Sequence, residues 1–161
     1  MSTPKNDPAV LFARFETIKK GKIIKLQDSG TGCSVGINLQ GHTCIKIKVD
    51  GCNGLTEIPG NKCDWCIKDC DSPGKYMFIE LKGKRHKSAD DAMRQIGNTI
   101  TWFVENIYGF SLKNVNPKCY SIMRPGCPHD TPTIQNLKLR FKRKYKCEFI
   151  MRDKGFIIPL Y

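Results

Sequence analysis

Two acidic residues and one lysine have the types and the spacing to carry out chemistry together. Glu80 and Lys82 flank Leu81 at the end of an apolar segment, and Asp64 precedes them in the chain. If the segment is a β-strand, the side chains at positions 80 and 82 project from one face, whereas Leu81 points to the opposite face. A neighbouring strand would bring Asp64 to the same place. The pattern therefore predicts two carboxylates and an ammonium group side by side.

Two carboxylates that converge in a basic protein repel one another unless a cation lies between them. Mg²⁺ is the natural occupant, with Mn²⁺ as the alternative, because a hard cation binds carboxylate oxygens and keeps several of its waters. Such a metal polarises a phosphoryl oxygen and acidifies a bound water, while a lysine orients that water and stabilises negative charge. The residues therefore predict metal-dependent hydrolysis of phosphodiester bonds, with Asp64 and Glu80 holding the metal and Lys82 orienting the attacking water.

The acid-x-lysine triplet has a simpler interpretation, an ion pair on an edge strand that contributes little to stability. Its context favours the catalytic interpretation. The triplet ends a strongly apolar segment, where an exposed ion pair is unexpected, and a long helix follows at once.

The elements that must position these residues are a strand and a helix. The apolar run predicts a buried strand over 76–82. A helix is expected from about Ser88 to Tyr108, because Ser88 and Asp91 form a capping-box pair and an apolar stripe follows at helical spacing. Gly109 is the expected stop.

The chain before this strand is predicted to contain one helix and several strands. Apolar residues at helical spacing predict a helix over 8–20, which carries Glu16. A turn at residues 40–42 is expected to close a hairpin between the second and third of four shorter strands. These strands are expected at 22–26, 34–39, 43–49 and 62–67.

The chain after the long helix is expected to contain a strand at 118–123, a helix and a closing hairpin over 147–160. Residues 132–146 fit a strand with one basic face, or a helix with an apolar stripe behind Thr131 and Pro132; we favour the helix. The order predicts an α/β fold with an αβββαβ core, in which helices flank a mixed central sheet. We expect residues 1–8 to be a flexible leader and residues 9–161 to form a single domain.

The sequence resembles the PD-(D/E)XK superfamily of restriction-endonuclease-like and resolvase-like nucleases. The resemblance depends on residues 62–65 (KCDW), on residues 78–83 (FIELKG) and on Gln95, and it spans roughly residues 10–125. It implies a restriction-endonuclease-like core and a divalent-metal-dependent endonuclease. Where many members have a proline before the first acid, this chain has Cys63.

The resemblance also implies roles for individual residues. Asp64 and Glu80 would be metal ligands, with the backbone carbonyl of Leu81 as the third, and Lys82 would be the catalytic lysine. Gln95 would join the catalytic group from the long helix. Glu16 matches an acid that some members carry near the metal on their first helix.

Nine cysteines raise the question of a second metal. An odd number of cysteines, without a secretory signal, indicates a reducing compartment and free thiols or metal ligands in place of disulfides. Residues 63 and 66 are three apart on an expected strand, so their side chains should point to opposite faces, and free thiols are favoured over structural zinc or an iron–sulfur cluster. The candidate ligands are Cys52, Cys63, Cys66 and Cys70, and, in a second group, Cys119, Cys127 and His129.

The net charge points to a polyanionic partner. The 161 residues include 27 Lys and Arg against 15 Asp and Glu, for a formal charge of +12, which favours nucleic acid. Basic residues directly after the motif strand and in the later helix, together with Arg124 between them, are expected to bind phosphates. They are Lys84, Arg85, Lys87, Arg124, Lys138, Arg140 and Lys142.

We therefore expect a nuclease, acting on DNA in preference to RNA. The alternatives are a nucleic-acid-binding module of the same fold without catalysis, and a member that cleaves RNA. The resemblance leaves a homodimer open, because such nucleases often cut both strands as dimers. No apolar run is long enough to cross a membrane, and the first residues lack a secretory signal, so we expect an intracellular, non-secreted protein.

Overall fold

The computed structural model describes residues 4–28, 30, 32–82 and 89–160, and this part of the chain forms two β-sheets and three helices. It is an α/β protein with a six-strand mixed sheet and a three-strand sheet. The six-strand sheet has the order β1-β4-β5-β6-β7-β8, and the three-strand sheet has the order β2-β3-β9. The strands are β1 (Glu16–Ile18), β2 (Ile23–Gln27), β3 (Ser34–Asn38), β4 (Cys44–Lys48), β5 (Trp65–Asp69), β6 (Tyr76–Lys82), β7 (Lys118–Met123), β8 (Phe149–Asp153) and β9 (Ile157–Pro159).

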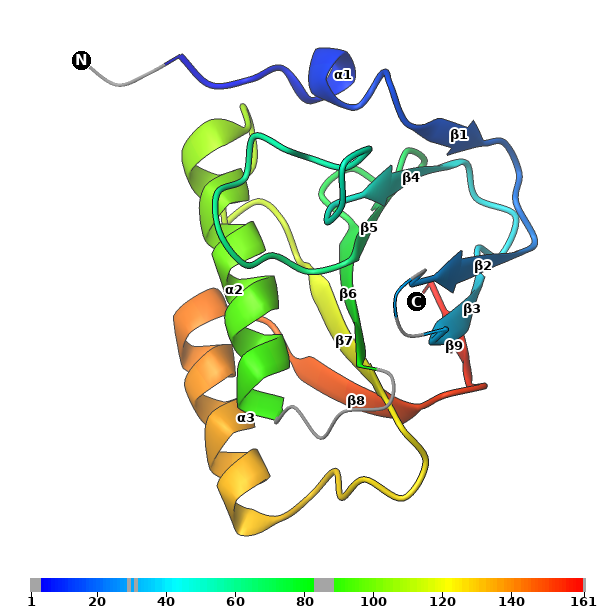
Figure 1. Ribbon diagram of the computed structural model, residues 1–161. Coiled ribbons are helices and arrows are strands. Elements are labelled where there is room, and N and C mark those ends of the chain that lie inside the picture. The colour runs from blue at the N-terminus through cyan, green and yellow to red at the C-terminus, as the bar shows by residue number, and fades with distance from the viewer. Residues whose placement is uncertain (1–3, 29, 31, 83–88, 161) are drawn as a thin grey trace.

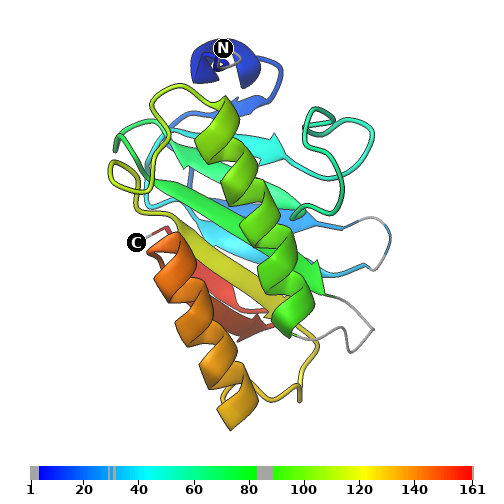
Figure 2. The same cartoon turned by 90° about the vertical axis from the view of Figure 1, so that its left-hand side faces the viewer.

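The elements stack in three layers. Helices α2 (Ala89–Asn106) and α3 (Pro132–Tyr145) cover one face of the six-strand sheet, and the three-strand sheet lies on the other side (Figure 1). Figure 2 shows both helices lying across the sheet. One apolar cluster, which includes Phe78 and Phe103, fills the space beneath the helices. A second cluster, which includes Ile79 and Ile158, fills the space between the two sheets.

Strand β6 runs through the middle of the large sheet, and all seven of its residues are buried. Met77, Ile79 and Leu81 pack between the sheets, whereas Phe78 packs beneath the helices. Because side chains alternate along a strand, Glu80 and Lys82 lie on the helix-facing side with Phe78. The predicted strand over 76–82 is confirmed.

The segments around β6 follow a β-β-β-α-β order. Strands β4, β5 and β6 pair antiparallel to their sequence neighbours, α2 then crosses the sheet, and β7 pairs parallel to β6. The predicted strand at 118–123 and the long helix are confirmed, and Gly109 adopts a φ of 75° just after the helix. The helical interpretation of 132–146 is also confirmed, with Thr131 capping α3 through the N–H of Ile134. The proposed Ser88 cap lies outside the described residues.

The predicted helix over 8–20 is wrong. Helix α1 (Pro8–Leu11) is a single turn, and Glu16 lies on β1, the edge strand that pairs with β4. The apolar spacing is helical, but strand pairing overrides it because it satisfies the backbone of residues 16–18. Asn6, in the expected leader, forms backbone hydrogen bonds with Asn106 and Tyr108 at the end of α2.

Both predicted hairpins are wrong in their pairing. A turn does form at Gln40 and Gly41, which adopt φ values of 53° and 79°. The strands on either side of it enter different sheets, since β3 pairs with β2 and β9 while β4 pairs with β1 and β5. At the C-terminal end, β8 pairs parallel to β7 and β9 pairs parallel to β3, so residues 147–160 connect the two sheets.

None of the helices within the described residues is long and apolar enough to span a membrane.

Candidate active site

Glu80 and Lys82 form an ion pair at the end of β6. The Lys82 Nζ lies 2.9 Å from the Glu80 Oε1, and both side chains are less than a tenth exposed. Two-residue periodicity puts them on one face, as the sequence predicted. An ion pair this deeply buried is costly to form unless further polar contacts complete it.

Helix α2 supplies those further contacts to Lys82. The Lys82 ammonium donates a hydrogen bond to the Gln95 Oε1, and it lies 3.4 Å from the Asp91 Oδ2. Residues four apart share one face of a helix, so Asp91 and Gln95 approach the lysine together. Gln95 is therefore brought to the predicted group. The sequence argument used Asp91 only as a capping partner and missed this contact, which its spacing from Gln95 could have indicated.

Asp64 reaches the site from the residue that precedes β5. Its N–H donates to the carbonyl of Ile79, and its carbonyl accepts from Val49 and Asp50. Its Oδ2 accepts a hydrogen bond of 2.7 Å from the N–H of Leu81. Main-chain bonds on both sides therefore fix the carboxylate against the strand segment that carries Glu80.

A threonine on α2 holds the segment before Asp64 in place. The Thr99 hydroxyl is fully buried, accepts a hydrogen bond of 3.1 Å from the N–H of Cys63, and donates to the carbonyl of Gln95. Thr99 therefore satisfies the backbone N–H of the residue before Asp64 and lies one helical turn from Gln95. The sequence analysis assigned no role to Thr99.

The environment disfavours negative charge on the two acids. Burial raises the pKa of Asp64 to about 6, although the N–H of Leu81 and the charge of Lys48 act in the opposite direction. Burial, followed by the charge of Asp64, raises the pKa of Glu80 to about 8, and the charge of Lys82 only partly offsets this. Carboxyl groups with raised pKa values in a buried pair are typical of functional sites.

The donor set fits a hard divalent cation. The Glu80 Oε2 is buried and accepts no hydrogen bond from any described residue. A buried carboxylate oxygen without a partner costs free energy, and a cation would satisfy it. Oxygen ligands suit Mg²⁺ and Mn²⁺, and Glu80, Asp64 and the adjacent backbone of Leu81 offer only oxygen.

Two further charged residues influence this site without having been predicted. Asp50 follows β4, and its charge raises the pKa values of both Asp64 and Glu80 after the larger effect of burial. Lys48 is the last residue of β4, and it lowers the pKa of Asp64. Neither belongs to a recognisable motif, because strand pairing alone brings β4 beside Asp64.

The cysteines do not form a metal site in the described part of the chain. Strand β5 begins only at Trp65, so the prediction that Cys63 and Cys66 point to opposite faces is wrong; both are buried in the cluster beneath the helices. Among the described residues, the one group of at least three potential ligands is His42, Asp69 and Asp71.

The remaining predicted residues lie apart from this group or outside the described residues. Glu16 is exposed on β1, and β4 and β5 separate that strand from β6, so its predicted position near the metal is wrong. Lys84, Arg85 and Lys87 lie outside the described residues. Arg124 is exposed after β7, and Arg140 is exposed on α3.

Two of the predicted phosphate-binding lysines on α3 form ion pairs. The Lys138 Nζ lies 3.1 Å from the Asp130 Oδ1, and the Lys142 Nζ lies 3.2 Å from the Glu148 Oε1. Exposed pairs of this kind are weak, so a phosphate could displace either carboxylate.

Comparison of the chain with models of protein families, with curated proteins and with solved structures finds no match.

Proposed function

We propose that this protein is a divalent-metal-dependent nuclease that hydrolyses phosphodiester bonds, with DNA as the favoured substrate. The observation that carries the proposal is the buried group of Asp64, Glu80 and Lys82, in which one oxygen of Glu80 has no partner among the described residues. The β-β-β-α-β order around it supports a restriction-endonuclease-like core. The net charge of +12 supports a polyanionic substrate.

In this proposal Asp64, Glu80 and the backbone carbonyl of Leu81 hold Mg²⁺ or Mn²⁺. The metal, when bound, polarises the phosphoryl oxygens and lowers the pKa of a coordinated water. The N–H of Leu81 fixes the orientation of the Asp64 carboxylate, so that little reorganisation accompanies binding.

Lys82 orients the nucleophile and stabilises charge. A water oxygen bonds to phosphorus, and the bond from phosphorus to the oxygen of the departing strand breaks. That oxygen takes up a proton, leaving a phosphate monoester and a hydroxyl. The ammonium of Lys82, which Glu80 and Gln95 hold in place, donates a hydrogen bond to the water or to the negatively charged phosphoryl group.

Cleavage assays on plasmid, linear duplex, single-stranded DNA and RNA test the proposal, each with Mg²⁺, with Mn²⁺ or with EDTA. We expect cutting only with a metal. Lys82→Ala should slow single-turnover cleavage by about 10²–10³-fold, as expected for the loss of one preorganised group at developing charge. Asp64→Asn and Glu80→Gln should be affected at least as strongly.

Asp69→Asn provides the matched control. Asp69 is a buried carboxylate at the other end of β5, where it contacts His42, so its replacement removes a buried charge outside the proposed site and leaves that site intact. Wild-type cleavage by Lys82→Ala, or equal losses in Asp69→Asn and Glu80→Gln, would contradict the proposal.

A binding module without catalysis is the second candidate, and the net charge favours it equally. It predicts steeply salt-dependent binding without cleavage under any divalent ion. Binding without cutting on all four substrates would favour this candidate, whereas cutting of RNA alone would retain the mechanism and change the substrate.

A further inference from the structure

The ammonium groups of two lysines on β4 lie over the ring of one tryptophan. The Lys48 Nζ lies 4.4 Å from the centroid of the Trp65 ring, and the Lys46 Nζ lies 5.0 Å from it. Lys46 and Lys48 are two apart on a strand and so project from the same face. Trp65 pairs with Lys48 across the sheet.

The Trp65 ring that contacts both ammonium groups is fixed in position. The Trp65 Nε1 donates a hydrogen bond of 3.2 Å to the carbonyl of Gln27, and the ring packs against the apolar cluster between the sheets. Cations are attracted to the face of an indole, so the ring fixes the place of two flexible side chains. The Lys46 Nζ also lies 3.4 Å from the carbonyl of Lys25.

Opposite charges act on the two lysines only at longer range, because Glu16 stands opposite Lys46 across the sheet and the charge of Lys48 reaches Asp64. Within the described residues, neither Lys46 nor Lys48 forms an ion pair with a carboxylate. Like charges held beside one another repel, and an anion between them would remove that repulsion.

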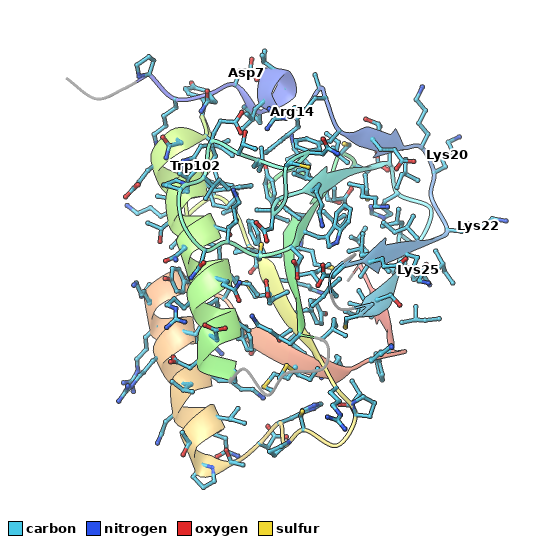
Figure 3. All side chains as sticks on the ribbon, in the orientation of Figure 1. Asp7, Arg14, Lys20, Lys22, Lys25 and Trp102 are labelled. Carbon is cyan, nitrogen blue, oxygen red and sulfur yellow. The ribbon has the colours of Figure 1, made fainter. Side chains whose placement is uncertain are left out.

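Lys46, Lys48 and Trp65 project from the face of the large sheet opposite to Glu80 and Lys82, and the charge of Lys48 reaches Asp64, whose pKa it lowers. Trp65 directly follows Asp64, and the N–H of Val49, directly after Lys48, donates to the carbonyl of Asp64 at 2.9 Å. Away from Asp64 the Lys46 ammonium lies against the backbone of Lys25 on β2. Figure 3 shows Lys20, Lys22 and Lys25 extending outward on the side of the molecule that carries β2.

We propose that Lys46, Lys48 and Trp65 form a binding surface for the phosphates that flank the scissile bond, and that the substrate strand leaves the active site along it. This inference rests on the proposed function for the identity of its ligand, a nucleic-acid strand. Lys48 contacts the phosphate nearest the site, Lys46 contacts the next one, and Trp65 holds both ammonium groups in position. None of the three belongs to the residues that the sequence argument assigned to phosphate binding.

The test compares the double variant Lys46→Ala/Lys48→Ala with a control that loses the same charge. Lys5→Ala/Lys113→Ala is the control, because both lysines are exposed. Lys5 reaches the carbonyl of Val104 in the last turn of α2, away from Gln95, and Lys113 follows that end of the helix in the chain. Binding to fluorescent DNA is measured with EDTA over a range of salt concentrations. We expect the first variant to bind about tenfold or more weakly, with the slope of log K against log salt reduced by about 2. The control should bind like the wild type.

A second readout uses Trp65 itself. Trp102→Phe leaves Trp65 as the single tryptophan, and adding an oligonucleotide should change its emission, reversibly with salt. This signal does not require the lysine variants to fold.

The experiments distinguish a failure of this inference from a failure of the proposed function. Wild-type affinity and slope in Lys46→Ala/Lys48→Ala, or an unchanged Trp65 emission at saturating DNA, would overturn the inference even if the wild type cleaves DNA. Loss of binding in that variant, from a protein that never cleaves, would support the surface and refute the nuclease.

Discussion

Glu80 is the residue at which burial and charge conflict most strongly. It is 4% exposed, one oxygen pairs with Lys82, and the other has no partner among the described residues. Burial and the neighbouring Asp64 both favour the neutral acid, and they raise its pKa to about 8. A residue in this state is a poor contributor to stability at neutral pH and a good ligand for a cation.

This conflict predicts a pH dependence of stability in the metal-free protein. Because the pKa of Glu80 rises from 4.5 in an exposed chain to about 8 in the fold, the folded state binds the proton more tightly. The favourable contribution is complete below about pH 4.5 and is lost as the pH rises through about 8. We expect the free energy of unfolding, measured with urea in EDTA, to fall by on the order of a few kcal/mol over this interval.

Glu80→Gln is the control for that prediction, since glutamine does not titrate. The difference in unfolding free energy between wild type and variant should grow in favour of the variant as the pH rises. Mg²⁺ should stabilise the wild type more at pH 8 than at pH 6, because the metal binds the ionised carboxylate. A flat difference between the two proteins from pH 5 to pH 8 would contradict the assignment.

At the scale of elements, α2 organises the site. Asp91, Gln95 and Thr99 recur every four residues, so one face of the helix meets Lys82 at its beginning and Cys63 further along. The helix thereby connects the end of β6 to the segment that precedes β5. The helix thus adds to the main-chain hydrogen bonds that fix Asp64 against the segment that carries Glu80.

Thr99→Val should therefore disturb both folding and catalysis. The variant removes the acceptor for the buried N–H of Cys63, which should cost about 1–3 kcal/mol of unfolding free energy. Asp64 follows Cys63, so we also expect single-turnover cleavage to slow while the affinity for DNA is retained. Urea unfolding and single-turnover assays measure the two effects.

Two further threonine variants check this explanation. Thr99→Ser keeps the hydroxyl and should restore both stability and rate. Thr101→Val changes an exposed residue on the same helix and should change neither by a measurable amount. A Thr99→Ser protein as impaired as Thr99→Val would show that the hydroxyl does not position Asp64.

At the scale of the whole molecule, the three-strand sheet closes the face of the large sheet opposite the helices. Ile158 on β9 is fully buried between the sheets, whereas its neighbour Ile157 is 53% exposed. Strand β9 reaches β3 from the far end of the chain. The C-terminal segment therefore completes the layer that supports Trp65 and the back of β6.

Ile158→Ala should destabilise the whole protein. Removing this side chain leaves a cavity in the core between the sheets, which should cost about 2–5 kcal/mol. Helical circular dichroism and Trp65 fluorescence, recorded in the Trp102→Phe protein, should report one coincident urea transition at a lower midpoint. Ile157→Ala should stay within about 0.5 kcal/mol of its parent. Separate transitions would show that the small sheet unfolds independently.

The sequence alone predicted those helices and strands that the local pattern of their own residues is enough to define. The seven buried residues of β6, the apolar stripe of α2 and the capped start of α3 each follow from a local period, and all three are confirmed. The placement of Glu80 beside Lys82 also follows from a local rule, the alternation of side chains along a strand.

Only the tertiary structure decided what depends on pairing between distant segments. Residues 16–18 form a strand because β4 accepts them, and the expected hairpins separate into two sheets because β3 and β8 find partners far along the chain. The same pairing brings Asp50 and Lys48 near Asp64. Local spacing carries no information about such partners, because the free energy of forming a sheet or a buried site comes from contacts between segments that the sequence does not place side by side.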